Sequence, residues 1–261
     1  MVTLLLLGLL IGIILGLTGA GGGILAIPAL MFSQNWSVTQ AAPIGLMAVT
    51  SAAIVGAIEG FIRKIVRYKA ALWIALVGII VTPYGIKASH ALPAKYLMIV
   101  FSLTMLVVAA RLFFTQATQE TKDAYCQMNP NTGRLHWTPK TVVVLGGVGA
   151  LTGFLTGLLG VGGGFVLVPV LRKTTDISIH SIVATSLMVI ALVGSGGIIS
   201  NFLQHSAIPL NIALPFMAAC IMGMFSGRQL IDYFTAQSVQ RIFATFVMIV
   251  AVVMFYRALV I

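Results

Sequence analysis

Long runs of apolar residues, interrupted at few places, dominate the chain. No charged residue precedes Glu59, none lies between Lys140 and Arg172, and none lies between Asp176 and Arg228. Charged residues, prolines and glycines divide the chain into eight apolar segments, near 2–33, 38–61, 70–88, 95–114, 140–171, 178–203, 207–228 and 236–260. A bilayer core is crossed by about 20 apolar helical residues, and inside it the backbone has no partner except its own helix. The pattern predicts an all-α integral membrane protein.

A polar stretch, 115–139, separates two membrane repeats, 1–114 and 140–261. Shifting the chain by 141 positions aligns eleven identical residues between 8–30 and 149–171. The identities include three consecutive glycines followed five residues later by a proline, which apolar composition alone does not produce. Duplicated membrane halves are typical of secondary transporters, in which the substrate site lies between the repeats.

The first segment of each half is long for a single crossing and is rich in glycine. Glycine fills five of the eight positions in 16–23 and again in 157–164. Glycine costs about 1 kcal/mol per helix-interior position relative to alanine, so each cluster predicts a helix break. A break at membrane depth is tolerated where it lines a protein cavity. Each segment is therefore either a bent crossing or a re-entrant helical hairpin that returns to its starting side.

Basic residues favour the hairpins, because cytoplasmic loops carry an excess of lysine and arginine. Eight plain crossings would divide the fifteen basic residues nine to six between the two membrane faces. With both glycine-rich segments re-entrant, twelve lie on one face and only Lys87, Lys95 and Arg257 lie on the other. We therefore expect two inverted four-segment repeats, with both termini outside and the 115–139 loop in the cytoplasm.

Composition agrees with this picture and excludes other classes of protein. A chain that is 59% hydrophobic and 8% charged does not form a water-soluble surface. The net charge of +10 does not indicate a nucleic-acid partner, because the basic residues lie at the edges of apolar runs and not on one wetted face. Membrane lipid is the expected surrounding, and a homo-oligomer stays open.

Catalytic and cofactor chemistry are not expected. The chain has five acidic residues, no nucleophile beside a base, and no spacing of histidine, cysteine or acidic residues that suits a metal. The dinucleotide motif G-x-G-x-x-G lacks its third glycine in both repeats, where Ile24 and Phe165 stand. We expect no enzyme activity and no cofactor.

The motifs GLTGAGGGILAIPAL (16–30) and GLLGVGGGFVLVPVL (157–171) are the strongest candidates for a ligand site. In the re-entrant geometry each glycine turn begins a half-helix, Ile24–Phe32 or Phe165–Arg172. Free N–H groups and the positive end of the helix dipole bind an anion without a buried charge. Tight helix packing is the alternative. It accounts well for scattered glycines such as Gly8 and less well for two triple glycines.

Polar residues within the apolar segments extend the candidates. Their side chains can donate hydrogen bonds to an oxyanion: Thr50, Ser51, Thr185, Ser186, Ser195, Ser200 and Asn201. Serine and threonine also bond to their own helix, so each hydroxyl alone favours a structural role, whereas Asn201 stands evenly between the two roles. Glu59 is favoured to pair with Arg63 one turn later, with proton coupling as the alternative. Arg63 could also attract anions to the cytoplasmic mouth.

The doubled motif G-x-x-G-x-G-G-G-x-x-x-x-P, the sequence Ala-Thr-Ser-Leu at 184–187 and the short length resemble the TauE/SafE family of sulfite and organosulfonate exporters. The resemblance covers essentially the whole chain. It implies export of small sulfur-containing anions across a bacterial-type cytoplasmic membrane. It also makes six glycines the first candidates for the substrate path: Gly21, Gly22, Gly23, Gly162, Gly163 and Gly164.

The two repeats are not expected to contribute identical sites, because Ile44 and Gly45 stand where the second half has Thr185 and Ser186. Two other functions stay open beside the secondary transporter of sulfur anions. One is a passive anion channel, and the other is a transporter of a small anion without sulfur.

Overall fold

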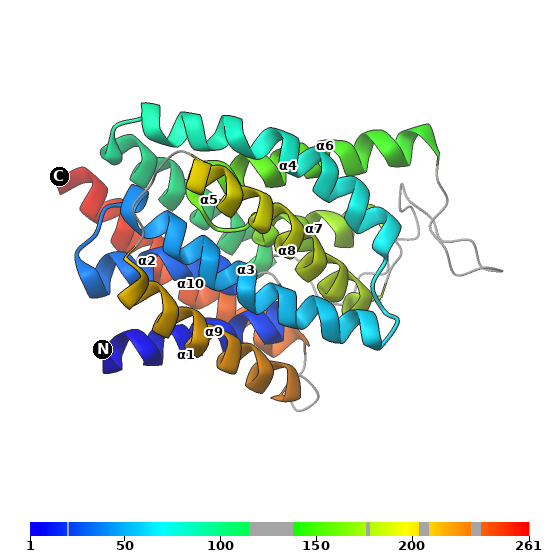
Figure 1. Cartoon of the computed structure of the whole chain (residues 1–261), viewed down its shortest axis with the longest axis horizontal. Coiled ribbons are helices and arrows are strands. Elements are labelled where there is room, and N and C mark those ends of the chain that lie inside the picture. The colour runs from blue at the N-terminus through cyan, green and yellow to red at the C-terminus, as the bar shows by residue number, and fades with distance from the viewer. Residues whose placement is uncertain (20, 115–137, 176–177, 204–208, 231–235, 261) are drawn as a thin grey trace.

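The computed structural model of the chain describes residues 1–19, 21–114, 138–175, 178–203, 209–230 and 236–260, and these ranges contain ten helices (Figure 1). In chain order they are α1 (Val2–Thr18), α2 (Gly22–Gln34), α3 (Val38–Ile62), α4 (Tyr68–Ala91), α5 (Ala94–Phe114), α6 (Pro139–Leu159), α7 (Gly164–Thr174), α8 (Ile179–Leu203), α9 (Leu210–Leu230) and α10 (Ala236–Val260).

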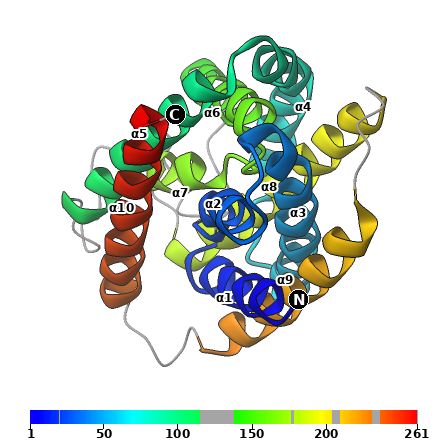
Figure 2. The same ribbon diagram turned by 90° about the vertical axis from the view of Figure 1, so that its left-hand side faces the viewer.

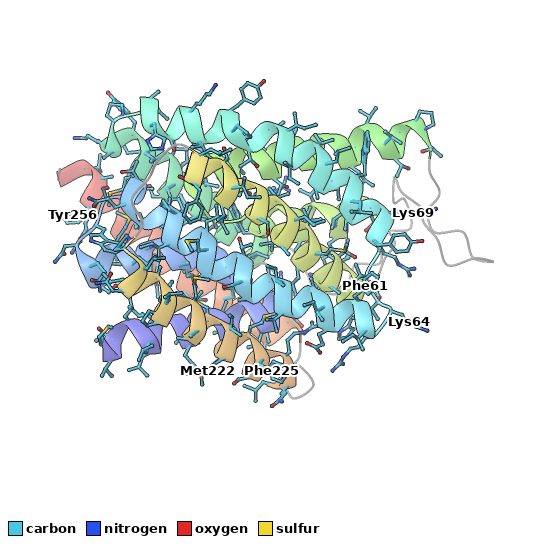
Figure 3. All side chains as sticks on the ribbon, viewed as in Figure 1. Phe61, Lys64, Lys69, Met222, Phe225 and Tyr256 are labelled. Atoms are coloured by element: carbon cyan, nitrogen blue, oxygen red, sulfur yellow. The ribbon has the colours of Figure 1, made fainter. Side chains whose placement is uncertain are left out.

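Seven of the described helices are long and apolar enough to cross a membrane, namely α3, α4, α5, α6, α8, α9 and α10. The remaining three are shorter, with 17 residues in α1, 13 in α2 and 11 in α7. Large apolar side chains such as Met222 and Phe225 point outward and are 64% and 61% exposed (Figure 3). Extensive exposed apolar surface of this kind marks contact with a membrane or a partner. The prediction of an all-α, multi-pass membrane protein is confirmed.

Both glycine clusters break the helix, as the sequence predicts. The helices α1 and α6 end on Gly19 and Gly160, whose φ angles of 72° and 68° lie in the left-handed region. Residues that carry a Cβ rarely adopt that backbone conformation, so glycine terminates each helix at low cost. The following helices, α2 and α7, extend the predicted half-helices at both ends. Each predicted long segment is therefore two helices.

The two glycine-broken segments run in opposite senses through the bundle. In Figure 1, α1 starts at the end that holds the N-terminus, and α2 returns toward that end. The helix α6 starts at the other end of the molecule, and α7 turns back toward it. Figure 2 looks onto the end that holds both termini and shows α2 near the centre of the bundle.

Helix pairs recur between the two halves. The helix α1 packs on α9, and its counterpart α6 packs on α4, while α3 packs on α8 and α5 packs on α10. Small residues allow these close approaches. Gly12 faces the backbone of Cys220 on α9, and the aligned Gly153 faces Gly78 on α4. These isolated glycines are packing residues, in agreement with the interpretation made from the sequence.

Basic residues gather at one end of the bundle, which we call the basic end. It is the end where α3 stops and α4 starts, and it carries Lys64 and Lys69 (Figure 3). Helix termini that lie there also carry Arg111, Lys140, Arg228 and Arg241. At the opposite end, where α4 stops and α5 starts, the helix termini carry Lys87, Lys95 and Arg257.

Of the predicted polar linker 115–139, all but the last two residues lie outside the described ranges. Pro139 is the first residue of α6, which therefore begins at the final linker position. Thr138 caps this helix, because its Oγ1 accepts a hydrogen bond of 3.2 Å from the Thr141 N–H. The division into the membrane repeats 1–114 and 140–261 stays a prediction.

Candidate substrate site at the glycine turns

The two glycine turns approach each other beside Val49 of α3. A Cβ atom at Gly23 would lie 3.2 Å from Val49 Cγ1, and one at Gly162 would lie 3.5 Å from the same atom. Gly162 also faces Ile190 of α8, which the 141-residue shift aligns with Val49. Motifs that are far apart in the sequence thus lie on either side of a repeat-related pair of apolar residues.

Each triple glycine packs tightly in this conformation. A Cβ at Gly22 would lie 2.7 Å from the Leu15 N of α1, and one at Gly163 would lie 2.5 Å from the Thr152 carbonyl oxygen of α6. A Cβ at Gly21 would lie 2.7 Å from the Phe243 ring of α10. Real side chains do not tolerate such contacts, so these glycines let α2 and α7 fold back onto the helices that precede them. Packing explains more of the triple glycines than the sequence indicates.

The turns also place two helix N-termini in the interior. Both half-helices lack a side-chain cap at their N-cap residues, Gly21 and Gly163. The Gly21 N–H donates to Thr18 Oγ1 at 2.9 Å, so one amide of the first turn already has a partner. The glycines of both motifs, including Gly164, are buried. The positive ends of two helix dipoles therefore point into a region of low dielectric, where they favour negative charge.

The second turn has a more polar wall than the first. Gly163 packs against Thr152 and Thr156 of α6, whereas the aligned Gly22 packs against Ile11 and Leu15 of α1. Thr156 Oγ1 donates to the Thr152 carbonyl at 2.7 Å. The Thr152 hydroxyl is fully buried and has no hydrogen-bond partner among the described residues. An unpartnered buried hydroxyl costs about 1–3 kcal/mol, so Thr152 is a candidate ligand contact.

The sequence candidates did not include Thr152 and Thr156. A signal was available, because the repeat shift aligns them with two apolar residues of the first half, Ile11 and Leu15. A polar residue in one repeat opposite an apolar residue in the other points to a position where the two halves differ in function.

Thr50 is the other buried hydroxyl without a partner in the described part of the chain. It is 1% exposed and faces Gly194 of α8, where a Cβ would lie 3.1 Å from the Thr50 Cβ. Its neighbour Ser51 donates to the carbonyl of Ala48 at 2.9 Å, the within-helix bond expected of a structural serine. Thr50 is therefore a stronger candidate for a ligand contact than Ser51.

Thr185 and Ser186 bond to the backbone of other segments. Thr185 Oγ1 accepts a hydrogen bond of 3.0 Å from the Arg67 N–H, at the start of α4. The single proton of the Ser186 hydroxyl is shared between the Gly19 carbonyl at 3.0 Å and the Val183 carbonyl at 2.8 Å. In this conformation the Ser186 hydroxyl holds the first glycine turn, and the Thr185 hydroxyl holds the start of α4.

Asn201 lies apart from Val49, at a small cavity of about 20 Å³ near the opposite end of the bundle. The cavity is also lined by Thr156, Gly157 and Gly160 of the second glycine segment and by His90 of α4. Space of this size holds about one water molecule. Asn201 and the second turn therefore share a polar space, whereas Thr50 and Ser51 do not line it.

Glu59 forms two ion pairs at the basic end. Its carboxylate lies 2.9 Å from Arg63 Nη2, which confirms the pairing predicted one helical turn apart. It also accepts a hydrogen bond of 2.9 Å from Arg228 Nε of α9. Arg228 is not predictable as a partner of Glu59 from the sequence, because it lies 169 residues away on another helix. The Arg228 side chain is 8% exposed, whereas that of Arg63 is 62% exposed.

Comparison with known proteins identifies the relatives of this chain. The sequence profile described as "Sulfite exporter TauE/SafE" matches residues 4–254. A "Probable membrane transporter protein" of Xylella fastidiosa strain 9a5c is 28% identical over 257 residues, covering 96% of this chain and 93% of the relative. The protein of the same description from strain Temecula1 is 30% identical over 259 residues, with the same coverage of 96% and 93%.

A more distant organism has a similar protein. A "Probable membrane transporter protein" of Methanocaldococcus jannaschii is 27% identical over 203 residues, which cover 76% of this chain and 70% of the relative. These descriptions state transport and name no substrate. The family profile spans almost the whole chain, and seven apolar helices in the described ranges can cross a membrane. The chain belongs to the sulfite exporter TauE/SafE family of membrane transporters.

Proposed function

We propose that the protein is a secondary transporter that exports small sulfur-containing oxyanions, such as sulfite or a short sulfonate, across a bacterial-type cytoplasmic membrane. One observation carries the proposal. Two glycine turns, each at the positive end of a buried half-helix, meet beside Val49 and Ile190. Such half-helix N-termini bind the anionic groups of substrates in other transporters with discontinuous helices. The family description supplies the sulfur chemistry.

The donors around the second turn suit an oxyanion. The backbone amides of Gly162, Gly163 and Gly164 and the hydroxyl of Thr152 donate hydrogen bonds without carrying a charge. Thr50 adds a second buried hydroxyl that no described residue uses. A site of this kind attracts an anion by dipoles and releases it more readily than a buried lysine or arginine would, which suits turnover.

We infer that the halves are inverted and that the pairs α1–α2 and α6–α7 are re-entrant hairpins. The opposite senses of α1 and α6 in the bundle support this topology. The basic residues support it too, because the end bearing Lys64, Lys69 and Arg241 is the side that the positive-inside rule assigns to the cytoplasm. Both termini then lie outside, and the 115–139 loop lies in the cytoplasm.

Solute counterflow tests the proposed function without knowledge of the coupling ion. Proteoliposomes are loaded with unlabelled sulfite and diluted into a trace of labelled sulfite. A carrier accumulates the label transiently above its equilibrium level, whereas a channel lets it equilibrate without an overshoot. We expect an overshoot with sulfite that excess external sulfonate suppresses. Equilibration without an overshoot would indicate a channel, and an overshoot with carboxylates alone would exclude the sulfur anions.

The isosteric variant Thr152→Val tests the site. It removes the unpartnered hydroxyl beside Gly163, so we expect the sulfite concentration at half-maximal exchange to rise. Thr104→Val is the matched control, because Thr104 is only partly buried on α5 and its hydroxyl bonds within its own helix at 2.7 Å. Equal exchange by both variants would remove Thr152 from the site.

A further inference from the structure

Repeat symmetry pairs an arginine of α9 with an isoleucine of α4. A Cβ at Gly16 of α1 would lie 3.0 Å from both Arg228 N and Gly227 Cα. A Cβ at the aligned Gly157 of α6 would lie 2.8 Å from Ile86 N and 3.0 Å from Gly85 Cα. By these contacts Arg228 and Ile86 occupy equivalent positions, one at the basic end and one at the opposite end, although the 141-residue shift aligns Arg228 with the next residue, Lys87.

The position at the basic end is closed. Arg228 reaches from α9 to Glu59 near the end of α3, with 2.9 Å between Nε and the carboxylate oxygen. Beside this ion pair, a Cβ at Gly60 would lie 2.8 Å from the Ala184 Cβ of α8. Three helices are thus in contact around the ion pair, and Val183 in the same turn of α8 is 4% exposed.

The equivalent position at the opposite end is a cavity. Ile86 lines it in place of Arg228, and Asn201 lines it where the repeat shift aligns Gly60. Ala42, which aligns with the buried Val183, also faces this space. The cavity extends to Thr156, whose Oγ1 lies 2.9 Å from the position of a Cβ at Gly163. The space therefore leads from the opposite end to the second glycine turn.

The lining of the cavity suits an anion. Asn201 and His90 present hydrogen-bond donors, and no acidic residue is among the lining residues. Lys87, one turn before His90 on α4, is exposed and adds positive charge at the same end. A small oxyanion is attracted by this potential and meets donors on its way to the turn.

Resting on the proposed function, we propose that this cavity, which holds about one water molecule in this conformation, lies on the access route of the anion to the second glycine turn. The Glu59–Arg228 ion pair closes the repeat-related route at the basic end. Opening that route separates α3 from α9 and parts the ion pair. Arg63 stays one helical turn from Glu59, so the negative charge of Glu59 remains paired during the movement. Closure of the cavity brings the helical turn that contains Asn201 toward Ile86. This contact is then the counterpart of the contact that Glu59 makes with Arg228 in the present conformation.

Thiol labelling at repeat-related positions tests this proposal. The native cysteines are replaced, Cys126 by serine and the buried Cys220 by alanine, and single cysteines are introduced as Ala42→Cys or Val183→Cys. The probe is 2-(trimethylammonium)ethyl methanethiosulfonate, a membrane-impermeant cation that an anion carrier does not transport, applied to right-side-out and inside-out vesicles. We expect Ala42→Cys to react from one membrane face and Val183→Cys to react slowly from both. Similar rates at the two positions overturn the proposal.

Glu59→Gln tests the closing role of the ion pair. In the Glu59→Gln background we expect the labelling rate of Val183→Cys to increase about tenfold, which is a typical coupling between two conformations. The increase is expected for probe added at the membrane face from which Ala42→Cys is not labelled. Arg228→Gln removes the other partner of the same ion pair, so we expect the same increase in labelling rate. Arg63→Gln is the matched control, because it leaves the Glu59–Arg228 contact in place. Unchanged labelling in both Glu59→Gln and Arg228→Gln overturns the closing role.

The labelling uses no transported substrate, so its outcome is independent of counterflow. Asymmetric labelling without sulfite exchange retains the access route and rejects the proposed substrate. Sulfite exchange with equal labelling of Ala42→Cys and Val183→Cys retains the proposed function and rejects the access route.

Discussion

Ser186 of α8 donates a hydrogen bond of 3.0 Å to the carbonyl oxygen of Gly19, which ends α1. The two residues are 167 positions apart and belong to different predicted repeats. The aligned turn of the second half, at Gly160, has Gly45 in place of the serine and packs against Ala42 without such a bond. The first glycine turn is therefore fixed to the other half of the protein by a bond that the second turn lacks.

Ser186→Ala is expected to destabilise the protein by about 1–3 kcal/mol, because it leaves the buried Gly19 carbonyl without this donor. Thermal unfolding in detergent measures the loss as a lower Tm. Ser195→Ala is the matched control, since the Ser195 hydroxyl bonds only to Ala191 in its own helix at 2.6 Å. A Tm decrease no larger than that of the control would show that the bond does not hold the turn.

Gly163→Ala is expected to be among the most damaging small substitutions in the chain. Its φ of 61° is strained for alanine, and the new methyl group would meet the Thr152 carbonyl oxygen at 2.5 Å. Overpacking alone costs about 1–3 kcal/mol. Gly147→Ala on α6 is the control, because nothing lies within 4 Å of its added Cβ. It should gain up to about 1 kcal/mol from helix propensity.

Monodispersity after size-exclusion chromatography and Tm compare these two variants. Loss of transport by Gly163→Ala alone would not identify a substrate contact, since the same change disturbs packing. A stable Gly163→Ala protein would contradict the close contact between α7 and α6.

The sequence predicts the elements of the fold well and their contacts poorly. The helices, their lengths and the breaks at Gly19 and Gly160 follow from local chemistry. The length of an apolar run and the tolerance of glycine for a positive φ angle are properties of the local sequence and need no tertiary contact. The pairing of Glu59 with Arg63 is predictable for the same reason. Arg228 is not, because its contact with Glu59 depends on how α9 packs on α3.

The candidate site shows the same limit. The triple glycines indicate a special backbone, yet the contact of Gly163 with Thr152 arises only when α7 folds back onto α6. Serine and threonine within apolar helices look alike in the sequence. Their roles separate only when the partners are known, with Ser51 bonded to its own helix and Thr50 left without a described partner.

The two ion pairs of Glu59 are expected to differ in strength. Arg63→Gln removes an exposed partner one helical turn away and should change stability by less than about 0.5 kcal/mol. Arg228→Gln removes a partner that is 8% exposed and leaves part of the Glu59 carboxylate without its donor, so it should cost more. A double-mutant cycle with Glu59→Gln, measured by Tm in detergent at low and high salt, gives each coupling. A larger coupling with Arg63 would contradict the burial of Arg228.

Thr50→Val separates a ligand contact from a structural hydroxyl by the sign of two effects. The Thr50 hydroxyl is buried and has no partner in the described part of the chain, so valine of the same shape should keep or raise the Tm. Removal of an unsatisfied buried group is worth up to about 1–3 kcal/mol. If the hydroxyl contacts the anion, the same variant weakens sulfite exchange and raises the half-maximal sulfite concentration.

Thr82→Val is the matched control. The buried Thr82 hydroxyl bonds to the Gly78 carbonyl at 2.8 Å, so this variant should lose stability instead. A Thr50→Val protein that loses stability and exchanges sulfite normally would assign Thr50 to the structure and leave Thr152 as the hydroxyl of the site.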